Sequence, residues 1–190
     1  MDFWDIVLVL MVLFAAVAAS YCYYDVKTGV PTFPTLPIVR GKMLAVIQED
    51  MAAKQAKISA GQAYTIIDLG SGSGQLSWHI ARALPQAQIV GIELSPVPYF
   101  RSVLHQRLFG PSNLSYKKVD FWSYDVSHAD AILTYLLGPV MERMSAKLHK
   151  ELQPGALVLS NKFRMVGWDH AEIMKIPVPF TQNLFVYRQA

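Results

Sequence analysis

The sequence has a single cysteine, Cys22, among its 190 residues, and this scarcity excludes two kinds of stabilising site. The chain can form neither an internal disulfide framework nor a zinc site built on cysteines. The net charge is only +3, and no run of Lys and Arg is long enough to form a nucleic-acid-binding patch. We therefore expect a protein of a reducing compartment without a nucleic-acid partner.

Metal-binding patterns, internal repeats and low-complexity tracts are also missing from the sequence. No two of the five histidines have the spacing of paired metal ligands, so we expect no metal site and assign them to surface or packing positions. These are His79, His105, His128, His149 and His170.

Hydrophobic residues are abundant, at 53% of the chain, and the surplus lies at the N-terminus. The run from Ile6 to Tyr24 carries no charge over about 19 residues, which as a helix approaches the ~30 Å hydrocarbon core of a bilayer. We predict a transmembrane anchor over residues 1–25. A cleaved signal peptide is the alternative, because "AVAAS" offers small residues, but Asp2 and Asp5 stand where a signal peptide carries basic residues.

The charges around this run predict how the chain is oriented. The nearest basic residues, Lys27, Arg40 and Lys42, all follow the run, and three tyrosines at its end suit the membrane interface. By the positive-inside tendency we expect a single-pass membrane protein whose remaining domain lies on the cytosolic, or an equivalent, side.

Residues 26–60 are predicted to connect the anchor to the domain. Prolines at 31, 34 and 37 disfavour a helix there and predict an extended connector. From Ile38 to about Ile58 the spacing of apolar residues predicts a lead-in helix that ends near Gly61.

From residue 61 to 190 the pattern alternates between strands and helices. Such alternation predicts an α/β, doubly wound, mostly parallel sheet of about seven strands, and a final pair of strands with no helix between them predicts a closing hairpin. The predicted strands are 64–69, 87–94, 114–119, 130–136, 155–163, 171–178 and 183–189, and the helices are 75–84, 99–109 and 140–152.

The first strand is followed by a glycine-rich turn, "DLGSGSG", which is the usual ligand site of such a sheet. A dinucleotide fingerprint would need glycine where the chain has Gln75 or Ser77, and a P-loop would need a lysine that is missing near the turn. Nucleoside triphosphates and dinucleotides are therefore disfavoured.

Carboxylates end three successive strands: Asp68, Glu93 and Asp120. They suit a cationic ligand rich in hydrogen-bond donors, such as one with ribose hydroxyls, an adenine amino group and an ammonium. A turn cap is the alternative role for Asp120.

The segments "IIDLGSGSG" and "GIEL" resemble class I S-adenosylmethionine-dependent methyltransferases, and the resemblance extends from Tyr64 to the end of the chain. It implies a Rossmann-like fold with S-adenosyl-L-methionine as cofactor. By the resemblance Glu93 would hold the ribose, and Asp120 would frame the adenine with Phe121. The implied cofactor-binding residues are Asp68, Leu69, Gly70, Ser71, Gly72, Gly74, Glu93, Leu94, Asp120 and Phe121.

The flanking segments are similar to a narrower group, the membrane-anchored lysine methyltransferases that modify adenine nucleotide translocase and the ATP synthase c-subunit, with their prokaryotic relatives. The similarity lies in the membrane helix, the connector "VPTFPTLPIVRGKML", the segment from Val119 to Phe163 and the tryptophan Trp168. Family members often carry an acidic residue where this chain has Ser73. The resemblance implies a lysine of a membrane protein as the acceptor.

The end of the fourth strand, "TYLLGP", faces the transferred methyl group in this fold, so we expect Tyr135 to line the transfer site. The segment lacks the Asn/Asp-Pro-Pro-Tyr motif of enzymes that methylate amide or nucleobase nitrogens, which disfavours those acceptors. Two other functions stay open, namely a small-molecule or lipid methyltransferase at the membrane surface and a non-catalytic S-adenosylmethionine-binding protein.

Overall fold

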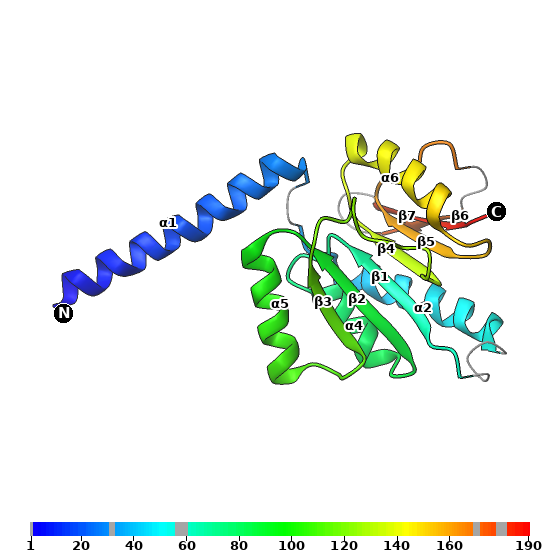
Figure 1. Ribbon diagram of the computed structural model, residues 1–190, viewed down its shortest axis with the longest axis horizontal. Coiled ribbons are helices and arrows are strands. Elements are labelled where there is room, and N and C mark those ends of the chain that lie inside the picture. Colours follow the sequence, from blue (N-terminus) through cyan, green and yellow to red (C-terminus); the bar gives the residue numbers. More distant parts are fainter. Residues whose placement is uncertain (1, 31–32, 56–60, 169–171, 178–181) are drawn as a thin grey trace.

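The computed structural model describes residues 2–30, 33–55, 61–168, 172–177 and 182–190. One long helix extends away from an α/β domain (Figure 1). The helices are α1 (Phe3–Thr28), α2 (Pro37–Ala53), α4 (Gln75–Ala83), α5 (Pro96–Phe109) and α6 (Gly138–Glu151). The strands are β1 (Tyr64–Leu69), β2 (Ala87–Glu93), β3 (Leu114–Lys118), β4 (Ala131–Thr134), β5 (Leu157–Asn161), β6 (Glu172–Ile176) and β7 (Gln182–Arg188).

The seven strands form one sheet in the order β3-β2-β1-β4-β5-β7-β6. The first five pair in parallel, and β7 pairs antiparallel with both β5 and β6. The predicted doubly wound sheet with a closing hairpin is therefore confirmed. The chain moves outward from β1 to β3 and then returns to β4 on the other side of β1, which opens a crevice at the carboxyl ends of the central strands.

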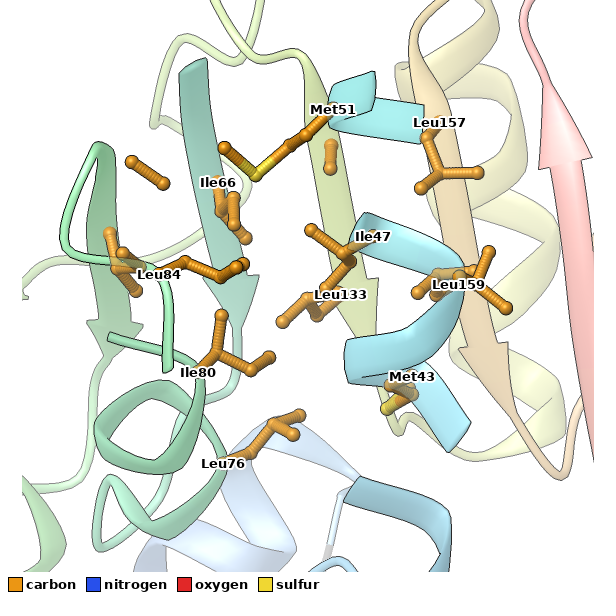
Figure 2. Packing of buried hydrophobic residues seen from close by; sticks show 14 of the residues in the cluster. Met43, Ile47, Met51, Ile66, Leu76, Ile80, Leu84, Leu133, Leu157 and Leu159 are labelled. Atoms are coloured by element: carbon orange, nitrogen blue, oxygen red, sulfur yellow. The ribbon is translucent and has the colours of Figure 1, made fainter. Parts of the chain in front are cut away.

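Alternate residues of the central strands enter two separate hydrophobic cores. Ile66 of β1 packs with residues of α2 and α4, whereas Ile67 packs on the opposite face with α6. Figure 2 shows the first core, in which Ile47 of α2 and Ile80 of α4 lie over the sheet. Burial on both faces explains why these strands are continuous apolar runs.

The lead-in helix α2 is also fixed to the sheet by a buried carboxylate. Asp50 is 1% exposed and accepts hydrogen bonds from Tyr64 of β1 and Arg188 of β7, while Lys54 forms an ion pair with it at 2.9 Å. Burial opposes ionisation, but these three partners outweigh it and hold the pKa of Asp50 below its ordinary value. This network fixes the C-terminal end of α2 relative to strands β1 and β7.

Three helices begin earlier than their sequence patterns predict, each with a proline in its first turn. Helix α2 begins at Pro37 instead of Ile38, α5 begins at Pro96 instead of Tyr99, and α6 begins at Gly138, before Pro139, instead of Val140. Proline is well tolerated in the first turn of a helix, where its missing N–H has no partner to lose. The predicted end of the lead-in helix near Ile58 lies outside the described residues.

The N-terminal helix α1 contains the predicted span and continues to Thr28. Asp2 and Asp5 form a capping box at its start, and Gly29 ends it in the left-handed conformation at φ 66°. None of its residues is buried, and it is long and apolar enough to cross a membrane. The two acidic residues that disfavour a signal peptide thus have a local structural role as helix caps.

Candidate functional site

The turn between β1 and α4 depends on three glycines with positive φ. Gly70, Gly72 and Gly74 have φ values of 77°, 56° and 77°. Residues with side chains rarely adopt this region, so glycine at alternate positions lets the turn curl tightly against the sheet. The amides of Gly70 and Ser71 both donate to the carbonyl of Ile92 at 2.9 Å, which ties the turn to β2.

Glu93, at the end of β2, holds the same turn through its side chain. One carboxylate oxygen accepts the Gly72 amide at 2.8 Å and the other accepts the Ser95 amide at 2.7 Å. The residue is 8% exposed and lines the cavity in front of the turn. Because each oxygen has a second lone pair, Glu93 retains acceptor capacity for a ligand.

Asp68, the penultimate residue of β1, is a buried carboxylate beside this cavity. It accepts a hydrogen bond from Ser77 at 2.5 Å. Burial raises the pKa of Asp68 to about 6, the hydrogen bond from Ser77 opposes the rise, and the negative charge of Glu93 adds to it. A cationic ligand in the cavity would favour the ionised form.

The cavity lies at the carboxyl ends of β1, β2 and β4, in the crevice set by the strand order. Most of the predicted site residues line it. These are Asp68, Gly70, Ser71, Gly72, Glu93, Leu94, Phe121 and Tyr135.

Three predicted site residues are not among the residues that line the cavity. The side chain of Leu69 is fully buried in the second core. Gly74 adjoins Tyr116, whose hydroxyl donates to its carbonyl at 3.0 Å. Asp120 accepts the Trp122 amide at 3.0 Å, which is the turn-capping role that the sequence left open.

The C-terminal end of α1 and described residues of the connector after it form a wall of the same cavity, which the sequence did not predict. Tyr21 and Thr28 of α1 line it, as do Val30, Phe33 and Thr35 from the connector. Thr35 is 9% exposed, whereas Phe33 is 65% exposed. The connector is therefore part of the site as well as a spacer.

A second hollow adjoins the cavity and shares Val30, Phe33 and Tyr135 with it. Phe163 completes its aromatic lining, with a ring centroid 6.5 Å from that of Tyr135 and an angle of 29° between the rings. Lys162, also in the lining, places its Nζ 5.7 Å from the Phe163 ring centroid. The hollow is mostly apolar and bordered by one positive charge.

Trp168 lies away from both spaces. Its indole N–H donates to the carbonyl of Ser145 at 3.1 Å, and its ring packs against Tyr187. It lines a separate hollow with His149. Within the described part of the chain, no three His, Cys, Asp or Glu side chains gather into a metal-binding group.

Comparison with known proteins identifies the family. A family model described as the ANTKMT methyltransferase domain matches residues 68–172. The chain belongs to this methyltransferase family. It is therefore an S-adenosylmethionine-dependent methyltransferase, as the glycine turn and its carboxylates predict.

Individual relatives agree with the family assignment. A protein-lysine N-methyltransferase of Saccharolobus islandicus is 30% identical over 77% of this chain and 85% of its own length. The adenine nucleotide translocase lysine N-methyltransferase of Mus musculus is 28% identical over 60% of this chain, which spans half of that enzyme. An RNA methyltransferase of Salinibacter ruber, solved with S-adenosyl-L-homocysteine, shares the fold at a TM-score of 0.67, 24% identity, and coverage of 82% of this chain and 93% of its own.

The residues around the cavity fit S-adenosylmethionine. Ser71 lines the cavity, and its buried hydroxyl, which lies beside Gly91 of β2, has no hydrogen-bond partner among the described residues. A Cβ built on Gly70 would lie 3.2 Å from Leu136, so a side chain there would narrow the site. Carboxylates for a ribose and for a positive charge, next to the apolar Phe121, match the chemistry of the cofactor.

Proposed function

We propose that this methyltransferase transfers a methyl group to the side-chain amine of a lysine in a membrane protein. The observation that carries the proposal is the apolar hollow that opens beside the cofactor cavity and shares Tyr135 with it. A lysine side chain, with four methylenes and a terminal amine, matches an apolar hollow beside the methyl donor. The names of the Saccharolobus islandicus and Mus musculus relatives support lysine as the acceptor residue.

The cofactor supplies a methyl group carried on a positively charged sulfonium. We expect Glu93 to accept hydrogen bonds from the ribose hydroxyls and the glycine turn to run along the methionine part. Asp68 would balance the positive charge, and Phe121 would border the adenine. Asp120 already caps a turn by accepting the Trp122 amide. It would bind the adenine only through the lone pairs that this bond leaves free.

The acceptor must present a neutral amine, since a protonated amine has no free lone pair. The apolar walls formed by Tyr135 and Phe163 would disfavour the charged form through desolvation. The positive charge of Lys162 would disfavour it further. We therefore expect the chain to act by orienting the amine and by favouring its neutral form, which releases its proton to water before it enters the hollow, with Tyr135 lining the point of transfer.

Membrane anchoring restricts the choice of acceptor. We propose that residues 6–24 of α1 span the bilayer and that the basic residues after α1 keep the domain on the cytosolic, or an equivalent, side. Because only residues 29–36 separate α1 from α2, the site stays close to the membrane surface. Tethering of this kind raises the effective concentration of acceptors in the same membrane.

The test is a transfer assay with the full-length protein, membranes from a strain that lacks this gene, and a cofactor labelled on its methyl group. Protein and lipid fractions are separated after the reaction. Label on a lysine of a membrane protein, identified by mass spectrometry, supports the proposal. Label confined to lipid or to a soluble metabolite contradicts it and favours a lipid or small-molecule methyltransferase.

A pair of variants connects the activity to the hollow. Phe163→Ala should reduce transfer to protein at least tenfold while cofactor affinity changes little, because Phe163 lines the second hollow and not the cavity. Ile173→Ala on β6 is the control, since Ile173 is 46% exposed and lines neither space. Equal transfer by the two variants would place the acceptor elsewhere.

A further inference from the structure

Helix α5 carries a row of large apolar side chains on the surface. Phe100, Leu104 and Leu108 recur every four residues and are 62%, 60% and 61% exposed, and Phe109 beside them is 69% exposed. Residues at this spacing share one side of a helix. These four residues are called the α5 apolar face below. Single exposed apolar residues are common, but a continuous row of them indicates a contact surface.

The surroundings of the α5 apolar face are positively charged. From Leu94 to Val119 the chain has no Asp or Glu. It has four basic residues there, all exposed, namely Arg101, Arg107, Lys117 and Lys118. The Lys118 ammonium lies 5.5 Å from the ring centroid of Phe100, so charge and apolar surface meet directly. An apolar helix face bordered by Lys and Arg is typical of helices that lie on anionic membranes.

The position of α5 relative to α1 indicates the same partner. The two helices contact each other, and residues of both, Tyr21 and Arg101, line the cofactor cavity. Figure 1 shows α5 at the edge of the domain on the side toward which α1 extends. Helix α5 thus lies on the side of the domain from which the proposed membrane span departs.

We propose that the α5 apolar face is a second membrane contact, which lies at the boundary between headgroups and acyl chains of an anionic bilayer. This inference rests on the membrane anchoring proposed above. A second copy of the chain fits the face less well, because pairing two α5 helices would bring the four bases of one copy against the same four of the other. Lipid phosphates and carboxylates supply the opposite charge.

Two contacts would define how the domain sits on the membrane. A single helix followed by a connector lets the domain rotate, whereas a helix that lies flat on the surface fixes its orientation. The N-terminal half of α5 borders the cofactor cavity through the N-cap residue Ser95 and through Arg101. The contact would therefore hold the cavity at a constant height above the bilayer, and the acceptors within reach would be those exposed at that height.

The experiment uses the full-length protein in vesicles and a fluorophore whose emission depends on polarity. The native Cys22 is replaced by serine, and Leu104→Cys supplies the labelling site. Doxyl-labelled lipids then quench any fluorophore that touches the bilayer. We expect quenching by doxyl groups near the headgroups, stronger in phosphatidylcholine vesicles that contain phosphatidylserine than in those without it.

Two further labelling sites make the result decisive. Glu142→Cys, on the exposed side of α6, is the matched control and should not be quenched. Leu13→Cys, within α1, reports whether the span itself is inserted. Quenching at 13 without quenching at 104 overturns the α5 contact alone, whereas no quenching at 13 overturns the anchor on which it rests.

Charge and oligomer controls complete the test. Arg107→Gln with Lys118→Gln should reduce the extra quenching caused by phosphatidylserine at least twofold, while Lys150→Gln on α6 should leave it unchanged. If the label at 104 were shielded from water but unaffected by doxyl lipids, and the shielding grew with protein density, a second copy would cover the face and the proposal would be wrong.

Discussion

At the scale of single residues, the buried Asp68 makes cofactor binding depend on pH. The pKa of Asp68 is about 6 when no cation lies beside it, and the cationic cofactor prefers the ionised form. Below pH 6 binding must therefore release one proton, so the affinity should fall about tenfold for each pH unit. Calorimetry at several pH values between about 5 and 8 measures this dependence of cofactor affinity on pH.

The Asp68→Asn variant separates this effect from other titrations. It should bind the cofactor more weakly at neutral pH and lose the steep slope below pH 6, whereas the exposed control Asp125→Asn should keep both affinity and slope. The cofactor-free protein should show the opposite trend in stability. Because the pKa of Asp68 rises on folding from 3.8 to about 6, the free energy of unfolding decreases as pH rises through that interval.

Glu93 is expected to contribute to binding in two ways. Glu93→Ala removes the proposed acceptor for the ribose and also frees the amides of Gly72 and Ser95. We expect the affinity for the cofactor to fall by about 1–3 kcal/mol, the usual loss for hydrogen bonds to a charged group. Calorimetry on protein with an unchanged circular dichroism spectrum measures it, with Glu142→Ala as the control. An unchanged affinity would remove Glu93 from the site.

The residues at strand ends were predictable from the sequence, but the wall above them was not. Asp68 and Glu93 end strongly apolar strands, and the crevice of a parallel sheet lies at those ends. Tyr21 and Thr35 are far from the turn in sequence, and only the folding of the connector over the sheet brings them to the cavity. The sequence left two roles open for Asp120, binding the adenine or capping a turn. The structure shows the second, because the carboxylate accepts the amide of Trp122, and the local turn geometry that allows this bond is not evident from the sequence.

At the scale of elements, Gly74 controls how closely α4 approaches β3. A Cβ at this position would lie 2.2 Å from the Tyr116 hydroxyl, and its φ of +77° already disfavours a side chain. Gly155→Ala is a matched control, because its φ is +81° and its Cβ would meet no atom within 4 Å. Strain alone should cost about 1–2 kcal/mol at Gly155, and overpacking should add about 1–3 kcal/mol at Gly74.

Denaturant unfolding of the two variants checks this prediction. The extra cost at Gly74 should shrink when Tyr116 is also replaced by leucine, since the smaller side chain leaves room for the added methyl group. Equal destabilisation by Gly74→Ala and Gly155→Ala would mean that the turn is limited by backbone conformation and not by its contact with Tyr116.

The elements themselves were largely predictable because the central strands β1, β2, β4 and β5 are short, mostly apolar runs and the segments between them show helical spacing of apolar residues. The ends were less certain where tertiary structure decides them. Pro96 reads as part of a loop in sequence, yet it begins α5 because the first turn of a helix accepts proline. The sequence did not reveal that the apolar row of α5 is exposed, because apolar residues at this spacing are equally typical of a helix that packs on a core.

At the scale of the whole molecule, the anchor and the connector should have separable effects. The full-length chain should stay with membranes after a carbonate wash, because residues 6–24 carry no charge and consist almost entirely of apolar and aromatic residues. A chain that begins at Lys27 should be soluble and still bind the cofactor. A chain that begins at Leu36 should bind it more weakly, since Thr28, Val30 and Thr35 no longer line the cavity.

Calorimetry on the two shortened chains measures the contribution of the connector, with their thermal unfolding compared to confirm that both are folded. Identical affinities would mean that the connector only spaces the domain from the membrane. Recovery of the full-length protein cleaved after Ala18 or Ala19 would identify the segment as a signal peptide.

The side chain of Tyr21 belongs to α1 and also forms part of the cofactor cavity. The charge-free part of α1 is about as long as a typical hydrocarbon core is thick, so in the proposed membrane-spanning arrangement lipids with longer or shorter acyl chains should change its tilt. A change in tilt should displace Tyr21 relative to the glycine turn. The residence time of the cofactor should then vary with acyl-chain length in reconstituted vesicles, and the enzyme would sense the thickness of the membrane in which it works.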